Sequence, residues 1–486
     1  MLKVSGNIAS GTVTLSRTTS SSSASAPSEV PPYVLAHFAI LHIVTSKWLI
    51  PACLATLLVC LWLSYRVDLN EFSMNLMYRN RLIRCYLGAT HQGRQPNPFS
   101  GLDSGDDLFL SALRSSEGYS GPLPILNGTL NLVSTRDLAW QERKAESFPM
   151  TPLRCGFDTW IEQRNLEKNY AIDKALKKVD DITKFAYRPT EKYGYVDKGM
   201  YVGTAMSISG AAASPNMGYH SVPSLALLMT FFNVRLGFWA RNPRNRKTWT
   251  HPGPKVGLGQ LLRELFGLTN DNAKYVYLSD GGHFENLGIY ELVKRRCKFI
   301  VACDAGADPD YSFDALGNAI RKCREDIGVE IEVDTTPLIP KSSGTDGDKS
   351  GKKQTTQHCV VGTIHYDMAD PEGGKGVFVY IKASLTGDEP ADVLNYQTGH
   401  TTFPHQSTAD QWFSESQFES YRRLGQHIVE TLFAGRESKA RGGQLISAPA
   451  SDKLRELSTT KLFDYLREKW PNVTPKPSQK PATPKS

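Results

Sequence analysis

A long apolar run is the clearest feature of the hydrophobic pattern along this chain. It extends from Trp48 to Tyr65 without a charged residue, and about 18 residues are enough to cross the hydrocarbon core of a bilayer. Trp48, Trp62 and Tyr65 stand where aromatic side chains meet the membrane interface. The alternative is a buried core helix, because Pro51 interrupts the run early. We favour a transmembrane helix within a hydrophobic membrane segment that covers residues 33–65.

Basic residues flank this run unequally. The preceding apolar stretch from Val34 to Thr45 is too short to span a bilayer and is expected to lie at the membrane interface. Because basic residues are retained on the cytoplasmic side of a span, residues 66 onward are predicted to be cytoplasmic. The basic residues concerned are Lys3, Arg17 and Lys47 before the run, and Arg66, Arg79, Arg81 and Arg84 after it.

Three segments have compositions that are poor in core-forming residues. Residues 1–32 are rich in Ser and Thr, with Glu29 as their only acidic residue, which predicts a disordered tail; a transit peptide is the alternative. Residues 340–357 are predicted to be a flexible insertion, because they have no large apolar side chain to pack. Residues 435–486 are predicted to be a basic, Pro-rich tail with one helix from about Asp452 to Glu468.

The pattern between these segments predicts an α/β fold. Tyr275–Leu278 and Lys298–Cys303 are β-prone runs, and a helical pattern from Glu285 to Arg296 separates them. A strand, helix, strand unit predicts two parallel and neighbouring strands joined by a right-handed crossover. Asp280 and Asp304 would then lie at the carboxyl ends of these strands, where open α/β sheets bind their ligands.

Further along the chain, the pattern predicts a hairpin and a helix. Residues 358–366 and 376–384 alternate as strands do, and a Gly-rich turn joins them. Ser407 is expected to cap an amphipathic helix that reaches about Phe433. We therefore expect one α/β domain over residues 66–434.

Composition narrows the classes of function. The chain has 486 residues and 40% hydrophobic residues, which is typical of a globular protein with room for a sizeable core. Its 56 Lys and Arg against 49 Asp and Glu leave a net charge of +7, which suits an anionic membrane surface but is too scattered to predict a nucleic-acid partner. The eight cysteines contain no C-x-x-C pair, so we expect reduced thiols rather than a disulfide framework or a zinc site.

Asp280 is the strongest catalytic candidate. Two glycines follow it, which predicts a tight turn that leaves the carboxylate free to act as a general base. The alternative is a turn aspartate that only binds its own backbone. His283 is a candidate for orienting the substrate or the carboxylate, with a surface-loop histidine as the alternative. Asp304, with Asp308 and Asp310, could bind a hard cation, but the spacing favours an ordinary strand-end loop, and no metal or cofactor is expected.

The stretch Asp280-Gly281-Gly282, followed by Asn286, resembles the catalytic Asp-Gly-Gly motif of the patatin-like phospholipases and the related cytosolic phospholipase A-type domains. Residues 207–218 are similar to the small-residue strand and proline turn that precede this aspartate in the family. Other stretches resemble a membrane-associated bacterial-type branch, and the likeness covers roughly residues 66–434. These stretches are Tyr78 to Arg81, Leu138 to Gln141, Thr386 to Glu389 and Phe403 to His405.

The resemblance implies a patatin-like sheet with flanking helices and a Ser-Asp dyad that hydrolyses a membrane phospholipid or another lipid ester. It makes Asp280 the base, with Gly281, Gly282 and Asn286 supporting the motif. The family's serine stands on a G-x-S-x-G elbow, and this sequence has no such pentapeptide; Gly118-Tyr119-Ser120-Gly121 comes nearest. One explanation is that this chain is the C-terminal portion of a longer enzyme.

Two other functions remain open from the sequence. The first is a catalytically silent membrane scaffold that keeps the fold but not the nucleophile. The second is a cation-dependent hydrolase that uses the three aspartates Asp304, Asp308 and Asp310.

Overall fold

The structure is a computed structural model, and its described residues divide into two units. The first unit is Met1–Leu69 with Pro254–Leu262, and the second is Asn70–Gly253 with Arg263–Ser486. The described residues are 2–7, 12–17, 46–134, 142–158, 186–194, 199–214, 229, 234–245, 248–251, 253–342, 353–407, 410, 412–433 and 458–470.

The first unit contains an antiparallel hairpin near the amino terminus. Strand β1 (Leu2–Asn7) pairs with β2 (Thr12–Arg17), so that Leu2 lies opposite Arg17. These two strands lie within residues 1–32, for which the composition predicts a disordered tail. The second strand begins with Thr12, Val13 and Thr14. These residues are β-branched, and β-branched residues favour extended backbone. The stretch from Val34 to Thr45 lies outside the described residues.

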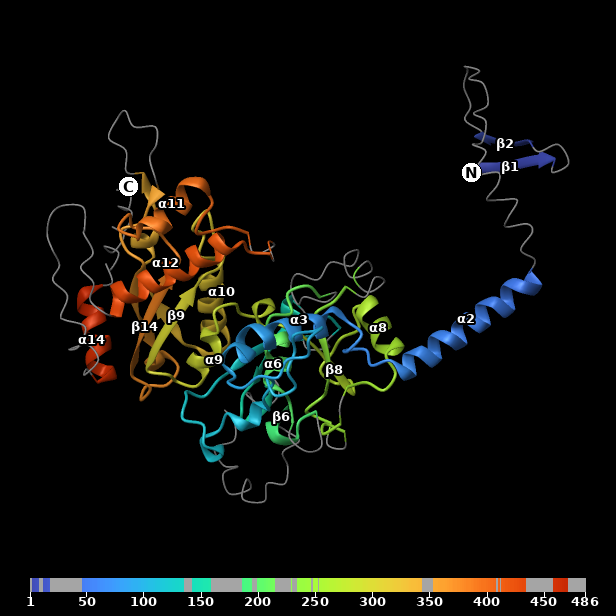
Figure 1. The fold of residues 1–486 in the computed structure, drawn as a ribbon, viewed down its shortest axis with the longest axis horizontal. Helices are drawn as coiled ribbons and strands as arrows, with labels where there is room; N and C mark the ends of the chain where they lie inside the picture. Colours follow the sequence, from blue (N-terminus) through green and yellow to red (C-terminus); the bar gives the residue numbers. More distant parts are fainter. Residues whose placement is uncertain are drawn as a thin grey trace, which may run out of the picture. The chain divides into compact units, whose positions relative to one another are not determined.

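The apolar run of the first unit forms the helix α2 (Ser46–Arg66), which is 21 residues long (Figure 1). None of its stretch Trp48–Arg66 is buried within the described residues, which counts against the alternative of a core helix. Pro51 is accommodated within the helix near its amino end and does not end it. By length and composition, α2 is a candidate membrane span.

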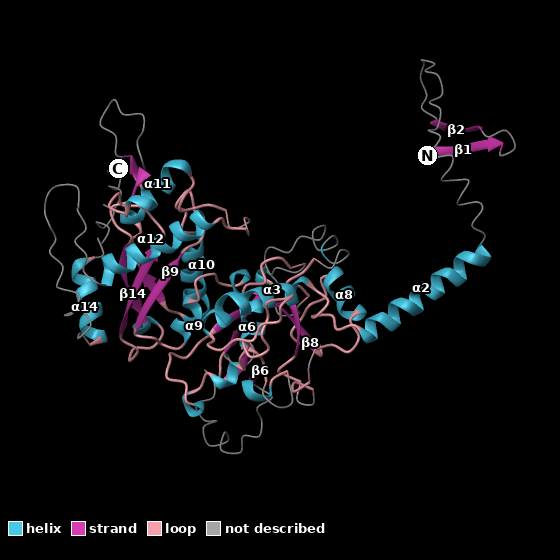
Figure 2. Cartoon of the chain, viewed as in Figure 1, coloured by secondary structure: helices cyan, strands magenta, loops and turns pink. Residues whose placement is uncertain are grey.

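The second unit contains a six-stranded sheet in which every pair of neighbours is antiparallel (Figure 2). Leu130, Phe148 and Leu278 of this sheet pack with Ala205 and Ile208 of helix α6 (Val202–Ser209) in one apolar core. The strands, in spatial order, are β6 (Ala186–Pro189), β5 (Arg154–Phe157), β4 (Ala145–Met150), β3 (Leu126–Asn131), β8 (Tyr275–Asp280) and β7 (Phe238–Arg241).

The second unit also contains a four-stranded sheet, and helices cover both of its faces (Figure 1). Side chains alternate along β14: Phe378 and Tyr380 pack with α9 and α10, whereas Val377 and Val379 pack with α11, α12 and α14. In spatial order the strands are β10 (Glu330–Glu332), β13 (Cys359–His365), β14 (Lys375–Lys382) and β9 (Phe299–Asp304). The helices are α9 (Ile289–Lys294), α10 (Asp314–Lys322), α11 (Ala391–Gly399), α12 (Glu415–Phe433) and α14 (Thr459–Lys469).

The strand pairing confirms one prediction and corrects another. Strands β13 and β14 form the predicted hairpin. Strands β8 and β9 are not neighbours, because β8 lies between β3 and β7 in one sheet and β9 pairs in parallel with β14 in the other. The local pattern identified both strands, but the six-residue helix α9 between them carries the chain from one sheet to the other. Asp280 and Asp304 do end their strands, in different sheets.

Several element boundaries also differ from the prediction. Residues 207–209 end the helix α6 and are not a strand. Helix α12 begins at Glu415 rather than after Ser407. Within the predicted insertion, Lys341–Ser342 pairs with Lys353–Gln354 in a two-residue ladder. In the predicted tail, Ser458 caps α14, and residues 434–457 and 471–486 lie outside the described residues.

Candidate functional site

Asp280 is the last residue of β8 and begins the tight turn that the sequence predicts. Its Oδ1 accepts a hydrogen bond of 2.6 Å from the backbone N–H of Gly282, and this contact caps a short 3₁₀ turn, Gly281–His283. The residue is partly buried. The carboxylate is therefore held in one orientation at the end of a central strand.

Backbone approaches closely at Gly281, and side chains approach closely at Gly282. A β-carbon added to Gly281 would lie 2.5 Å from the carbonyl oxygen of Asn127 in β3. One added to Gly282 would lie 2.6 Å from Oδ1 of Asn286 and 3.0 Å from Oδ1 of Asp280. The turn therefore brings together all four residues of the motif that the sequence singled out.

Burial changes the acid–base properties of this turn. Desolvation raises the pKa of Asp280, although the hydrogen bond from Gly282 opposes the effect. Tyr78, on helix α3 (Met74–Leu82), also has a raised pKa, because it is buried and lies near the Asp280 carboxylate. A phenol that keeps its proton is thus near a carboxylate of increased basicity.

Tyr78 is a residue of the site to which sequence reasoning assigned no role. Helix α3 packs closely on α6, and a β-carbon on Gly210, which ends α6, would lie 2.3 Å from the Tyr78 hydroxyl oxygen. A β-carbon on Gly203 would similarly lie 2.5 Å from Ile83. The small residues of α6 therefore admit Tyr78, and this long-range contact has no local sequence signal.

His283 is held by a buried hydroxyl. Its Nδ1 lies 2.8 Å from Oγ of Ser279, which in turn accepts a hydrogen bond of 2.8 Å from Asn131. The residue Ser279 is 0% exposed, so this Ser-His pair cannot present a nucleophile to a substrate. We interpret the pair as a device that orients the His283 ring.

Asp304 is engaged inside the protein. Its Oδ2 accepts hydrogen bonds from Tyr380 at 2.5 Å and from the buried Lys382 ammonium at 3.0 Å. Lys382 also lies 3.6 Å from Asp308, while Asp310 is exposed. The ammonium occupies the place between Asp304 and Asp308 that a hard cation would need, which counts against the cation-dependent alternative.

The stretch Gly118-Tyr119-Ser120-Gly121 has none of the geometry of a nucleophile elbow. It follows a 3₁₀ turn, Ser115–Glu117, and Ser120 is exposed in irregular structure. An elbow instead places its serine on a sharp turn between a strand and a helix. The stretch Leu138 to Gln141 and residues 215–218 lie outside the described residues.

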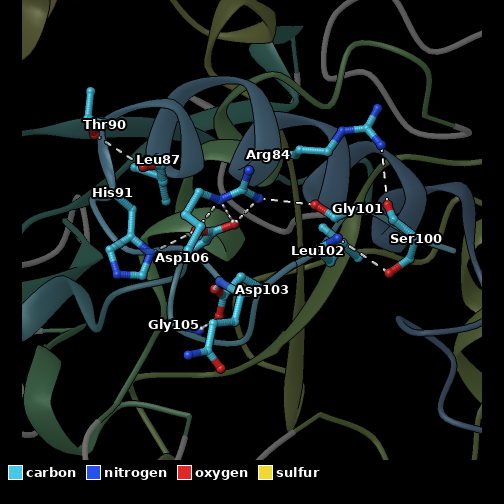
Figure 3. A network of polar contacts seen from close by, with 12 residues as sticks. Arg84, Leu87, Thr90, His91, Ser100, Gly101, Leu102, Asp103, Gly105 and Asp106 are labelled. Atoms are coloured by element: carbon cyan, nitrogen blue, oxygen red, sulfur yellow. Dashed lines mark hydrogen bonds and ion pairs between the residues drawn. The ribbon is translucent and has the colours of Figure 1, made fainter. Parts of the chain in front are cut away.

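A second polar cluster surrounds the buried carboxylate of Asp106 (Figure 3). His91 contacts it at 3.0 Å, and Arg94 donates hydrogen bonds at 2.6 and 2.9 Å. The hydrogen bonds from Arg94 lower the pKa of Asp106 to about 2. Because the guanidinium already balances this carboxylate, the cluster is an internal ion pair that holds the loop after α3.

Comparisons with known proteins give a distant structural match. No family model matches the sequence, and no curated protein matches it. Among solved structures, human GIVD cytosolic phospholipase A2 aligns with a TM-score of 0.34 and 16% sequence identity. The alignment covers 78% of this chain and 53% of that chain, so this protein spans about half the length of the structure it matches.

Proposed function

We propose that this protein contributes the base of a membrane-anchored lipid acyl-ester hydrolase of the patatin-like type. The observation that carries the proposal is the geometry of Asp280. Its carboxylate ends a central strand, is fixed by the Gly282 N–H at 2.6 Å, and has a pKa raised by burial. The resemblance of residues 280–286 to the family's Asp-Gly-Gly motif supports the same role.

The chemistry follows from what this carboxylate can do. Asp280 accepts the proton of a serine hydroxyl while the serine oxygen attacks the carbonyl carbon of the lipid ester. The ester bond then breaks and the alcohol leaves with a proton, after which water releases the acyl group as a fatty acid. A raised pKa makes the carboxylate a stronger base near neutral pH. In the described part of the chain, only Oδ1 of its side chain is engaged in hydrogen bonds, which leaves Oδ2 for the proton.

The serine is not part of a G-x-S-x-G pentapeptide in these 486 residues. We propose that it is supplied from outside them. Helix α2 supports the membrane-anchored character of the enzyme, since its exposed apolar surface suits a bilayer. A phospholipid is then the proposed substrate class, because phospholipids form the bilayer in which the protein would be anchored.

The test compares Asp280→Asn with Asp310→Asn, introduced into the full protein in its native membranes. Asp310 is an exposed aspartate in the loop after β9 and serves as the matched control. Release of fatty acid from phosphatidylcholine vesicles and labelling by a fluorophosphonate are measured together. We expect Asp280→Asn to lower hydrolysis by at least about 100-fold, the usual contribution of a general base, and Asp310→Asn to leave it unchanged.

The size of the labelled band locates the serine. A labelled protein that is captured through this chain and is larger than 53.9 kDa supports a nucleophile outside it. Hydrolysis that survives Asp280→Asn in a folded protein, as judged by its thermal unfolding, contradicts the proposal. Wild-type membranes with neither captured label nor hydrolysis would also contradict it and favour the silent scaffold.

A further inference from the structure

Four metal-ligating side chains come together between the four-stranded sheet and α12. His358 immediately precedes β13, Asp388 and Glu389 lie in the loop after β14, and His427 lies on α12. One ligand atom from each lies within 4.8 Å of all the others. His358, Glu389 and His427 are buried, and Asp388 is partly buried. The cluster belongs to the other sheet from Asp280 and takes no part in the proposed hydrolysis.

The distances suit a small cation. Nε2 of His427 lies 3.3 Å from Oδ1 of Asp388, and Nε2 of His358 lies 3.9 Å from Oε1 of Glu389. A tetrahedral zinc ion with ligands at about 2.0 to 2.2 Å separates its ligand atoms by about 3.3 to 3.6 Å. The four ligand atoms lie within 4.8 Å of one another, so some pairs would have to approach by up to about 1.5 Å to surround such an ion.

The contacts of His358 are compatible with a lone pair on Nε2 that faces the cluster. Its Nδ1 lies 3.1 Å from Oγ of Ser384, and the Ser384 hydroxyl donates its own hydrogen to the carbonyl oxygen of Lys382 at 3.2 Å. In the tautomer whose Nδ1 carries the hydrogen and donates it to Ser384, Nε2 is left as an acceptor that faces the cluster. An outward Nδ1–H donor of this kind is the usual arrangement for a metal-binding histidine.

Three acceptors share a single hydroxyl hydrogen inside the cluster. Oγ1 of Thr386 lies 2.5 Å from Oδ1 of Asp388, 3.1 Å from Nε2 of His358 and 3.3 Å from Oε1 of Glu389. A threonine hydroxyl donates only one hydrogen, and the shortest contact gives it to Asp388. Oε1 of Glu389 also accepts the Thr386 backbone N–H, so Nε2 of His358 is the acceptor atom for which a cation would be the partner.

The negative charge of the cluster also favours a bound cation. Glu389 accepts hydrogen bonds from the backbone N–H groups of Thr386 at 2.6 Å and Gly387 at 2.9 Å. Among the described residues, no Lys or Arg forms an ion pair with Glu389, in contrast to Asp106, which Arg94 balances. Burying the Glu389 carboxylate is costly unless a positive charge offsets it.

We propose that His358, Asp388, Glu389 and His427 bind one zinc ion. Two imidazole nitrogens with two carboxylate oxygens form a donor set that suits zinc. Four protein ligands close the coordination sphere, which is typical of a structural rather than a catalytic site. The ion ties the loop after β14 to the start of β13 and to α12.

The test uses the full-length protein in detergent, purified without a polyhistidine tag, stripped with a chelator and titrated with zinc chloride. We expect one zinc ion per chain with a dissociation constant below 1 µM, and a rise in the temperature of unfolding on zinc addition, because the ion binds the folded state. His427→Gln and Asp388→Asn should each weaken binding by at least about 100-fold and abolish that rise. His365→Gln is the matched control, since His365 ends the same strand β13 and instead lies 3.3 Å from Glu332.

Each result decides the proposal. Stoichiometric zinc in the wild type and in His365→Gln, lost in Asp388→Asn, supports it even if His427→Gln fails to fold, because Asp388 lies in a partly exposed loop. A stripped wild type that takes up no stoichiometric zinc overturns it and leaves a hydrogen-bonded cluster. Unchanged zinc binding in Asp388→Asn and His427→Gln also overturns it, because the zinc would then bind elsewhere.

Discussion

At the scale of single residues, the candidate site depends on two glycines, which have no side chain, as well as on Asp280. Gly281 has its backbone close to Asn127 of β3, and Gly282 makes room for Asn286 beside Asp280. Residues without a side chain let the backbone turn approach its neighbours while one carboxylate remains partly exposed. The position of Asp280 should therefore respond to very small additions of volume at these glycines.

The substitution Gly281→Ala should destabilise the protein by about 1–3 kcal/mol, because the new β-carbon would lie 2.5 Å from a backbone oxygen that cannot move alone. Thermal unfolding of the protein in detergent checks this. Gly425→Ala is the matched control, since Gly425 is exposed on α12 and an added β-carbon meets nothing within 4 Å. That control should gain about 0.5–1 kcal/mol from helix propensity. Equal melting of Gly281→Ala and wild type would show that the turn is loosely packed.

The buried Asp106 should make stability depend on pH. Its native pKa of about 2 lies below the unfolded value of about 3.9, so its stabilising effect is complete above pH 4 and disappears as the pH falls toward 2. Asp106→Asn should cost about 1–3 kcal/mol at pH 7, because Arg94 and His91 lose a charged partner.

Melting curves between pH 7 and pH 3 test this expectation. The gap between wild type and Asp106→Asn should narrow below pH 4, and the exposed Asp310→Asn should follow the wild type throughout. A gap of the same size at every pH would mean that the ion pair with Arg94 is not the source of the effect.

At the scale of elements, the local sequence pattern predicted helices and hairpins that form from neighbouring residues. The helix α2 and the hairpin of β13 and β14 follow from an apolar run and from alternation, and the structure has both. The predicted start of α12 is seven residues too early, because a cap at Ser407 would begin the helix at residue 408 and the helix begins at Glu415. The strand predicted at residues 207–209 is the end of helix α6, since small residues fit a buried helix as well as a strand.

Deletion of Trp48 to Tyr65 should release the protein from membranes washed with carbonate. The reason is that the deletion removes the exposed apolar surface of α2. Immunoblots of pellet and supernatant measure the effect. Replacing the same residues by an unrelated run of leucine and alanine should keep the protein in the pellet, which controls for shortening of the chain. A wild type found in the carbonate supernatant would mean that α2 does not span.

At the scale of the whole molecule, the sequence could not predict which strands meet. The position of Asp280 at a strand end was predictable from β-prone residues followed by Gly-Gly, but its neighbours were not. Tyr78 and Asn127 reach it from distant segments, and β8 and β9 went to different sheets. The four residues of the proposed zinc site come from three separate segments, so no spacing rule for metal sites would have found them.

The orientation of the protein in the membrane is a further prediction at this scale. Arg66, Arg79, Arg81 and Arg84 follow α2 closely, so the larger part of the chain should lie in the cytoplasm. In cells with a selectively permeabilised plasma membrane, protease should digest a tag at the carboxyl terminus. A lumenal marker in the same sample should stay intact. A protected tag beside an intact marker would reverse the predicted orientation.

The order of strands in the two sheets also determines how long some strands must wait for a partner during synthesis on the ribosome. In the six-stranded sheet, Asn131 of β3 bonds Ser279 of β8, which follows it by 148 residues. Strand β4 pairs with one edge of β3 soon after synthesis, but at about 5–20 residues per second the other edge would wait about 7–30 seconds for β8 to be made. Strand β9 waits similarly for β14, whose Tyr380 lies 76 residues beyond Asp304. During these intervals unpaired strand edges are exposed in the crowded cell, so we expect the nascent chain to depend on chaperones until residue 382 has left the ribosome.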